Sequence, residues 1–243
     1  MKETYYVGAY WRARRESAES CARRAESFFR HLGACDPSLA HWFKKGWTLE
    51  EALTHRLESD AAGLAKVFDQ QAQKEGRFAD EGFSLNGWNG QTQEAASSFS
   101  VVCGDGSVWV PNSCLLYPPD EGPAQERILQ APMLARILRA MAVAWEPEWG
   151  VATSDEHRDM VAPESPKAGT FVSWLMYISH RRGPLPSLPP PVHVEPVEDK
   201  GTLVVLTPKR FTVSNPAHLE LARDVSERLD RAGLLYPLRP FDE

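Results

Sequence analysis

The sequence predicts an α+β fold, with a mixed, largely antiparallel sheet or sheets and helices packed on one side. Strand-like segments come in groups after helical ones, whereas a doubly wound parallel sheet would alternate strands and helices one to one. Two of these segments are joined by Gly104-Asp105-Gly106, whose glycines permit the positive φ of a hairpin turn. The helical segments each carry one apolar stripe, as helices packed on a sheet do.

The chain opens with a strand and a helix. Aromatic residues and alternation predict a strand over residues 4–11. Ser17 and Glu19 precede an apolar stripe, which predicts a helix from about residue 17. Further helices are predicted at Asp36-Pro37, an N-cap followed by proline, and after Thr48, which forms a capping box with Glu51.

Two groups of strands follow. The first is predicted at residues 83–88, 97–103 and 107–116. A helix with apolar residues from 134 to 145 precedes the second group, at 149–153, 170–179, 192–197 and 202–206. A last helix carries apolar residues from 217 to 229 and is predicted to end at Gly233.

The proline- and acid-rich segment 117–123 separates the two groups of strands. At 243 residues the chain can bury the core of one large domain or of two small ones. We expect residues 1–243 to form a single domain. The alternative is two similar α+β halves, 1–117 and 124–243, joined by this segment, although no repeated string supports a duplication.

Composition predicts a soluble globular protein of the cytoplasm. Hydrophobic residues make up 42% and charged residues 25% of the chain, and no apolar stretch is long enough to cross a bilayer, so we expect no membrane partner. The four cysteines form no Cys-x-x-Cys pair, and the seven histidines are scattered singly. We therefore expect no metal ion and no cofactor.

Acidic residues are concentrated in the first half. Residues 61–123 hold three Lys or Arg against eight Asp or Glu. Because nucleic-acid binding requires cations that neutralise phosphates, nucleic acid is not expected as a direct ligand. A basic protein would be attracted instead, although an acidic face that serves only solubility has the same composition.

Two groups of residues resemble catalytic sites. Ser154-Asp155-Glu156-His157 combines a hydroxyl, carboxylates and an imidazole, but Ser154 as an N-cap with acids in the first turn of a helix explains it more simply. Asp120 with Glu198-Asp199-Lys200 resembles a metal-dependent nuclease set. These acids are predicted to lie in loops far apart in sequence, whereas metal catalysis needs a rigid scaffold.

The chain has eight tryptophans. Periodicity predicts that Trp109, Trp145 and Trp174 belong to the core. The other five, at element ends or beside polar residues, are either partly buried or anchors of an interface, where aromatic residues dominate binding. They are Trp11, Trp42, Trp47, Trp88 and Trp149.

Three strings indicate a family. They are the opening run from Thr4 to Ser17, Leu85-Asn86-Gly87-Trp88-Asn89-Gly90, and Trp149-Gly150-Val151-Ala152-Thr153-Ser154. Together they resemble the immunity protein 52 family of bacterial polymorphic toxin systems. The resemblance implies inhibition of a cognate toxin by protein–protein binding, and the toxins that accompany this family include nucleases with a restriction-endonuclease-like fold and type VI secretion effectors.

We therefore expect a non-enzymatic immunity protein whose partner is the nuclease domain of a toxin. Carboxylates placed like phosphates would suit the basic cleft of such a nuclease, and aromatic anchors would slow dissociation. Two other hypotheses are an uncharacterised hydrolase or metal-dependent nuclease, and a non-enzymatic adaptor or scaffold. The candidate toxin-binding residues are Trp11, Asp80, Glu81, Trp88, Asp120, Glu121, Glu195, Glu198 and Asp199.

Overall fold

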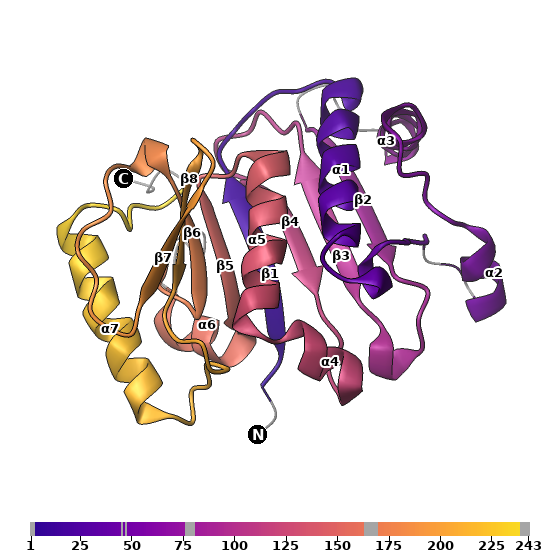
Figure 1. The fold of residues 1–243 in the computed structure, drawn as a ribbon. Helices are drawn as coiled ribbons and strands as arrows, with labels where there is room; N and C mark the ends of the chain where they lie inside the picture. The colour runs from indigo at the N-terminus through magenta and orange to yellow at the C-terminus, as the bar shows by residue number, and fades with distance from the viewer. Residues whose placement is uncertain (1–2, 45, 47, 76–80, 163–169, 239–243) are drawn as a thin grey trace.

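The computed structural model describes residues 3–44, 46, 48–75, 81–162 and 170–238. Its centre is one eight-stranded sheet of order β2-β3-β4-β1-β5-β6-β8-β7, in which all neighbours are antiparallel (Figure 1). The strands are β1 (Tyr5–Trp11), β2 (Phe83–Trp88), β3 (Ser98–Cys103), β4 (Asn112–Tyr117), β5 (Trp149–Ser154), β6 (Leu175–Ser179), β7 (His193–Val197) and β8 (Gly201–Val205). The predicted α+β class is confirmed.

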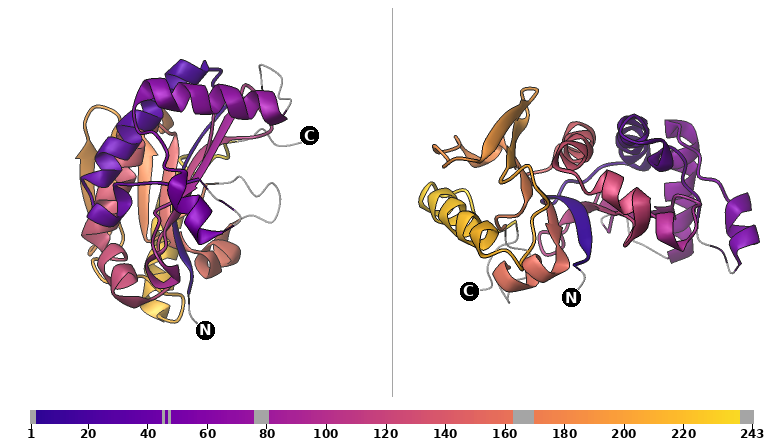
Figure 2. Two further views of the ribbon diagram at one scale, coloured as in Figure 1. Left: turned by 90° about the vertical axis from the view of Figure 1, so that its right-hand side faces the viewer. Right: turned by 60° about the horizontal axis from the view of Figure 1, so that its bottom comes forward.

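Helices lie on both sides of this sheet but cover it unequally. They are α1 (Ala18–Gly33), α2 (Leu49–Thr54), α3 (Ala61–Glu75), α4 (Gly122–Ile128), α5 (Ala131–Trp145), α6 (Asp155–Val161) and α7 (Pro216–Arg231), with short 3-10 turns at Pro37–Leu39, Gln93–Ala95 and His180–Arg182. One face of the sheet carries α1, α3 and α5 (Figures 1 and 2). On the other side, α6 and α7 lie beside β5, β6 and β8, so the helices are not all on one side as the sequence predicted (Figure 2).

Helix starts and ends follow the local sequence. The side chains of Ser17 and Thr48 accept hydrogen bonds from backbone N–H groups three residues later, at 3.3 and 3.1 Å. Asp36 caps the 3-10 turn that begins at Pro37. Two residues after α7 ends, Gly233 has a φ of +70°, which glycine adopts without strain. These predictions are confirmed because each cap is formed within a few residues.

The N-terminal strand β1 lies in the interior of the sheet. It pairs with β4 on one side, for example Ala9 with Cys114, and with β5 on the other, where Ala9 faces Gly150. Strands from before and after the segment 117–123 therefore share one sheet, and β1 joins them.

The largest helix contribution to the core comes from α5. It lies against α1 and the sheet, and its buried residues include Leu134, Ile137, Leu138, Met141 and Trp145. Trp145 stacks on Trp11 of β1 with ring centroids 5.5 Å apart and planes at 15°. Among the described residues no single helix is long and apolar enough to cross a membrane, and the bent pair of α4 and α5, at 71°, meets that test by length and composition only.

Two strands begin later in the structure than the sequence predicted. The ladder of β4 starts at Asn112, not at residue 107, because Asp105 and Asn112 close a wide loop between them. The Asn112 amide donates to the carbonyl of Asp105 and accepts from its N–H, at 3.1 and 2.9 Å. Likewise β6 starts at Leu175, not at residue 170. Just before it, the indole of Trp174 donates to the carbonyl of Thr207 at 2.9 Å.

Asn112→Ala is expected to lower the free energy of unfolding by about 3 kcal/mol, since Asn112 is fully buried and its loss leaves backbone groups of Asp105 and Arg12 without a partner. Urea denaturation measures the change. The matched control is Asn86→Ala, an exposed asparagine on β2, which should change stability by less than about 0.5 kcal/mol. Equal effects of the two substitutions would show that the Asn112 contacts contribute nothing particular.

Candidate functional site

The side of β2, β3, β4 and β1 that turns away from α1 carries no helix among the described residues, and only the Gln71 side chain of α3 reaches its β2 edge, where it donates to the Ser84 hydroxyl at 3.2 Å (Figure 2). We call it the open face. Strand residues alternate between the two sides, and those facing the helices, such as Val101 and Cys114, are buried. Ten residues on the open face are partly or fully exposed: Tyr10, Ser84, Asn86, Trp88, Ser98, Ser100, Val102, Ser113, Leu115 and Tyr117.

Strand register places these side chains in three rows. The rows are Trp88, Ser98 and Tyr117; Asn86, Ser100 and Leu115; and Ser84, Val102 and Ser113. Hydroxyl and amide groups are therefore interspersed with aromatic and aliphatic ones across the face. Such a mixture offers both hydrogen bonds and apolar contact to another surface.

Three tyrosines close the β1 side of the open face. Tyr6, itself buried, lies with its ring 6.4 Å from that of Tyr117. Gly8 leaves room for Tyr10, since a Cβ at Gly8 would lie 2.6 Å from the Tyr10 hydroxyl. The guanidinium of Arg158, from α6, sits 5.6 Å from the centre of the Tyr6 ring. Burial raises the pKa of both Tyr6 and Tyr10, so their hydroxyls stay neutral.

Charged residues border the open face but are absent from its ten exposed positions. None of these ten residues is an acid or a base at neutral pH. Arg158 borders it beside Tyr6, and Asp120 and Glu121 are exposed in the segment that follows Tyr117. An uncharged centre with a charged border is the usual layout of a protein interface.

The predicted acidic candidates do not form one cluster. Glu81 is exposed just before β2, at the end of the sheet opposite to Asp120 and Glu121, which follow β4. Asp80 lies outside the described residues.

The remaining candidates lie at the far edge of the sheet. Glu195 on β7 is already engaged, since it accepts a hydrogen bond from Arg139 of α5 at 3.0 Å and lies 3.1 Å from His193. Glu198 and Asp199 are exposed in the turn between β7 and β8.

The nuclease-like set is split by the fold. Asp120 follows the end of β4 that lies beside Tyr6, whereas Glu198 and Lys200 precede β8 at the end of the sheet beside Trp11. Three strands, β1, β5 and β6, lie between β4 and β8. These acids therefore cannot hold one ion together, because a metal needs its carboxylates within one coordination shell. Among the described residues no three His, Cys, Asp or Glu side chains come together as a metal site.

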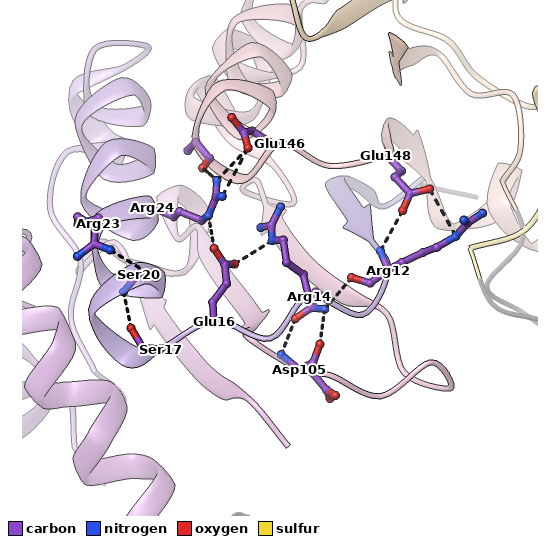
Figure 3. A network of polar contacts seen from close by, with 12 residues as sticks. Arg12, Arg14, Glu16, Ser17, Ser20, Arg23, Arg24, Asp105, Glu146 and Glu148 are labelled. Atoms are coloured by element: carbon purple, nitrogen blue, oxygen red, sulfur yellow. Dashed lines mark hydrogen bonds and ion pairs between the residues drawn. The ribbon is translucent and has the colours of Figure 1, made fainter. Parts of the chain in front are cut away.

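Where β1 meets α1, α5 and β8, a polar network holds the ends of these elements together (Figure 3). Glu16 accepts from Arg14 at 2.9 Å and from Arg24 at 2.7 Å. Arg24 also lies 3.5 Å from Glu146, which accepts from Lys200 at 2.8 Å. The Lys200 hydrogen bond keeps the pKa of Glu146 below its ordinary value. Each of these charged groups has an ion-pair partner within the network, so we assign the network a structural role.

Two tryptophan predictions are corrected by the structure. Trp11, a candidate anchor, is only 2% exposed because it points toward the helices and stacks on Trp145. A partner could not reach it without displacing α5. Trp109, predicted to be core, is 56% exposed because it lies in the wide loop before β4. Trp88 is partly exposed on the open face, with its ring 6.3 Å from that of Phe43.

The other tryptophans are mostly buried. Trp145 and Trp174 are core residues, as predicted, and Trp42 and Trp149 are also buried; Trp47 lies outside the described residues.

Ser154-Asp155-Glu156-His157 is a helix N-terminus, as predicted. The hydroxyl of Ser154 accepts from the backbone N–H of His157 at 3.2 Å and so caps α6. The His157 imidazole is fully buried, 3.3 Å from the hydroxyl of Thr153 and 4.7 Å from the ring of Phe211. Burial lowers its pKa from 6.5 to about 4, so it is neutral at physiological pH.

Comparison with known proteins agrees with the sequence resemblance. A sequence profile of the family described as immunity protein 52 matches residues 3–238. The solved structure of the Pseudomonas aeruginosa T6SS protein PA0821 is similar, with a TM-score of 0.54 and 14% sequence identity over 99% of this chain and 76% of that chain. At this identity the likeness shows a shared fold. A search of curated protein sequences gave no match.

His157 predicts a pH dependence of stability. The unfolded chain binds a proton at this residue below about pH 6.5, and the folded chain does so only below about pH 4. The stability that comes from burying the neutral imidazole is therefore complete above pH 6.5 and is lost as the pH falls to 4. His157→Phe, which keeps an aromatic ring against Phe211, should reduce this loss by about 2 to 3 kcal/mol. Urea unfolding from pH 7 to 4 measures it.

The control for this experiment is His55→Gln, at an exposed histidine that directly follows α2. It should follow the wild-type profile throughout. If His157→Phe and wild type lose stability in parallel between pH 7 and 4, His157 is not buried as a neutral group.

Proposed function

We propose that this chain, which belongs to the immunity protein 52 family, protects the cell that makes it by binding and neutralising one cognate toxin. The observation that carries the proposal is the family match, which runs from residue 3 to residue 238 and so includes every strand and helix of the fold. An immunity protein acts by occupying its toxin, and occupation requires a stable complementary surface and no chemistry of its own.

The toxin we propose is a nuclease effector of a type VI or related secretion system. Two observations support this target. The structural neighbour is named as a T6SS protein, and the chain carries a net charge of −6 with exposed carboxylates at both ends of the sheet. A nuclease binds a polyanion through a basic cleft, which an acidic inhibitor complements. Because such a nuclease attacks nucleic acid inside the cell, we place this chain in the cytoplasm.

Binding without catalysis is the mechanism that the geometry favours. The acids that resembled a nuclease site lie at opposite ends of the sheet, and the hydroxyl of Ser154 is used to cap α6. A general adaptor would share this lack of assembled chemistry. It differs in its partner, which would not be a toxin.

Co-expression with the toxin encoded beside this chain should restore growth to cells that the toxin alone kills, and the two proteins should co-purify at a ratio of 1:1. The control is the toxin expressed with an empty vector. Death of cells that contain the full-length chain at a level equal to the toxin would contradict an immunity role. Survival without co-purification would contradict neutralisation by binding.

Charge complementarity predicts that association depends on salt. The association rate constant should fall by about tenfold or more between 50 and 300 mM NaCl, since salt screens the attraction between this acidic chain and a basic cleft. Stopped-flow or surface plasmon resonance gives the rate. An association rate that is equal at both salt concentrations would show that charge does not contribute to recognition, but it would not contradict binding.

A further inference from the structure

We propose that the open face is the surface on which the toxin docks, with the loop before β4 at one end and the segment after β4 at the other. This inference rests on the proposed function and assigns that function to a place on the molecule. The partner is a folded protein domain whose contact surface is apolar and hydrogen-bonding at its centre and basic near Asp120 and Glu121.

The composition of the open face differs from that of a sheet face exposed only to water. Charged residues make up 25% of the chain, yet none of the ten positions on this face is charged. A sheet face that only meets water normally carries charged and polar side chains. A region without charged residues that lies inside a charged border and retains aromatic residues is instead typical of the centre of an interface.

The chemical groups on this face suit another protein surface. Trp88, Tyr117 and Tyr10 present large rings that lose little conformational freedom when they are covered. Ser98 and Ser100 lie between them on β3 and present hydroxyls that both donate and accept. Antigen-binding surfaces use this same combination of tyrosine, tryptophan, serine and asparagine.

The strands of the open face are too small an area for a stable protein interface, so we include the bordering loops in the proposed contact. Four strands and five residues along each give about 300 Å². A stable protein interface covers about 800 Å² on each partner, so the contact must extend beyond the strands. At one end of β3 and β4, Val108, Trp109 and Val110 are 54%, 56% and 46% exposed in consecutive positions. At the other end lie Asp120 and Glu121, next to the exposed ring of Tyr117.

Other parts of the sheet are less accessible to a partner. The opposite face is covered by α1, α3 and α5, and α6 and α7 lie over β5, β6 and β8 (Figures 1 and 2). At the edges, β7 contains Pro196, which lacks a backbone N–H, and Phe43 already pairs with Trp88 of β2. Among the described strands, a broad uncovered surface therefore remains on the open face.

Ser100→Arg tests this surface directly. Ser100 lies at the centre of the face and is partly exposed, so an arginine can extend into solvent in the free protein but blocks a docked partner and loses its hydration there. We expect binding to the toxin at least about 100-fold weaker than wild type and loss of protection in co-expression. The matched control is Val194→Arg, a 41% exposed strand position on β7 at the other edge of the sheet, which should bind and protect as wild type does.

A second variant guards against a folding defect. Asn86→Arg places the same side chain on an exposed position of β2 in the same row as Ser100. Thermal unfolding identifies which variants keep the wild-type melting temperature, and those variants are the ones compared. We expect each folded open-face variant to lose toxin binding.

The outcomes separate the two proposals. If wild type binds the toxin and both folded arginine variants bind equally well, the docking surface is elsewhere and the immunity role stands. If wild type neither binds nor protects, the proposed function itself is wrong. If sedimentation shows that wild type alone is a dimer which Ser100→Arg dissociates without weakening toxin binding, the open face joins two copies of this chain and the inference is overturned.

Discussion

The structure depends on the position of β1 inside the sheet. This strand pairs with another strand along each edge, and its two faces meet different surroundings. Val7, Ala9 and Trp11 point toward α1 and α5, whereas Tyr6, Gly8 and Tyr10 point the other way. With both edges of β1 paired, strands from before and after the segment 117–123 become one sheet with a common core. Loss of β1 would separate the β2–β4 group from the β5–β8 group within the sheet and would remove Tyr10 from the open face.

Features encoded by neighbouring residues could be predicted from the sequence, and features set by distant contacts could not. The apolar stripe of α1 and the caps at Ser17, Thr48 and Ser154 involve residues within one or two turns of a helix. The start of β4 depends on Asn112, whose amide donates to the carbonyl of Arg12, a hundred residues earlier. The spacing of hydrophobic residues along the chain does not indicate that contact. For the same reason Trp11 and Trp109 exchanged their expected roles.

The candidate site shows the same division. Alternation in β3 shows from sequence that Ser98 and Ser100 share one side of a strand, but whether that side is covered depends on where α1 and α3 pack. The acidic residues are equally visible in the sequence, and only the strand order reveals that Asp120 and Glu198 lie at opposite ends of the sheet. A single sequence therefore identifies the groups that can bind a partner, whereas the topology decides which of them can act together.

A toxin inhibitor must bind quickly and dissociate slowly, and the proposed surface separates these requirements. Exposed acids at the border act over a Debye length and increase the rate of encounter. The uncharged centre acts only on contact, where aromatic and hydroxyl groups lose water together and slow dissociation. The centre lies on paired strands backed by the core, where Phe29 of α1 packs against Phe99 of β3, so little conformational freedom would be lost on binding. On this proposal, the rigidity of the sheet lengthens the residence time of the inhibitor on the toxin.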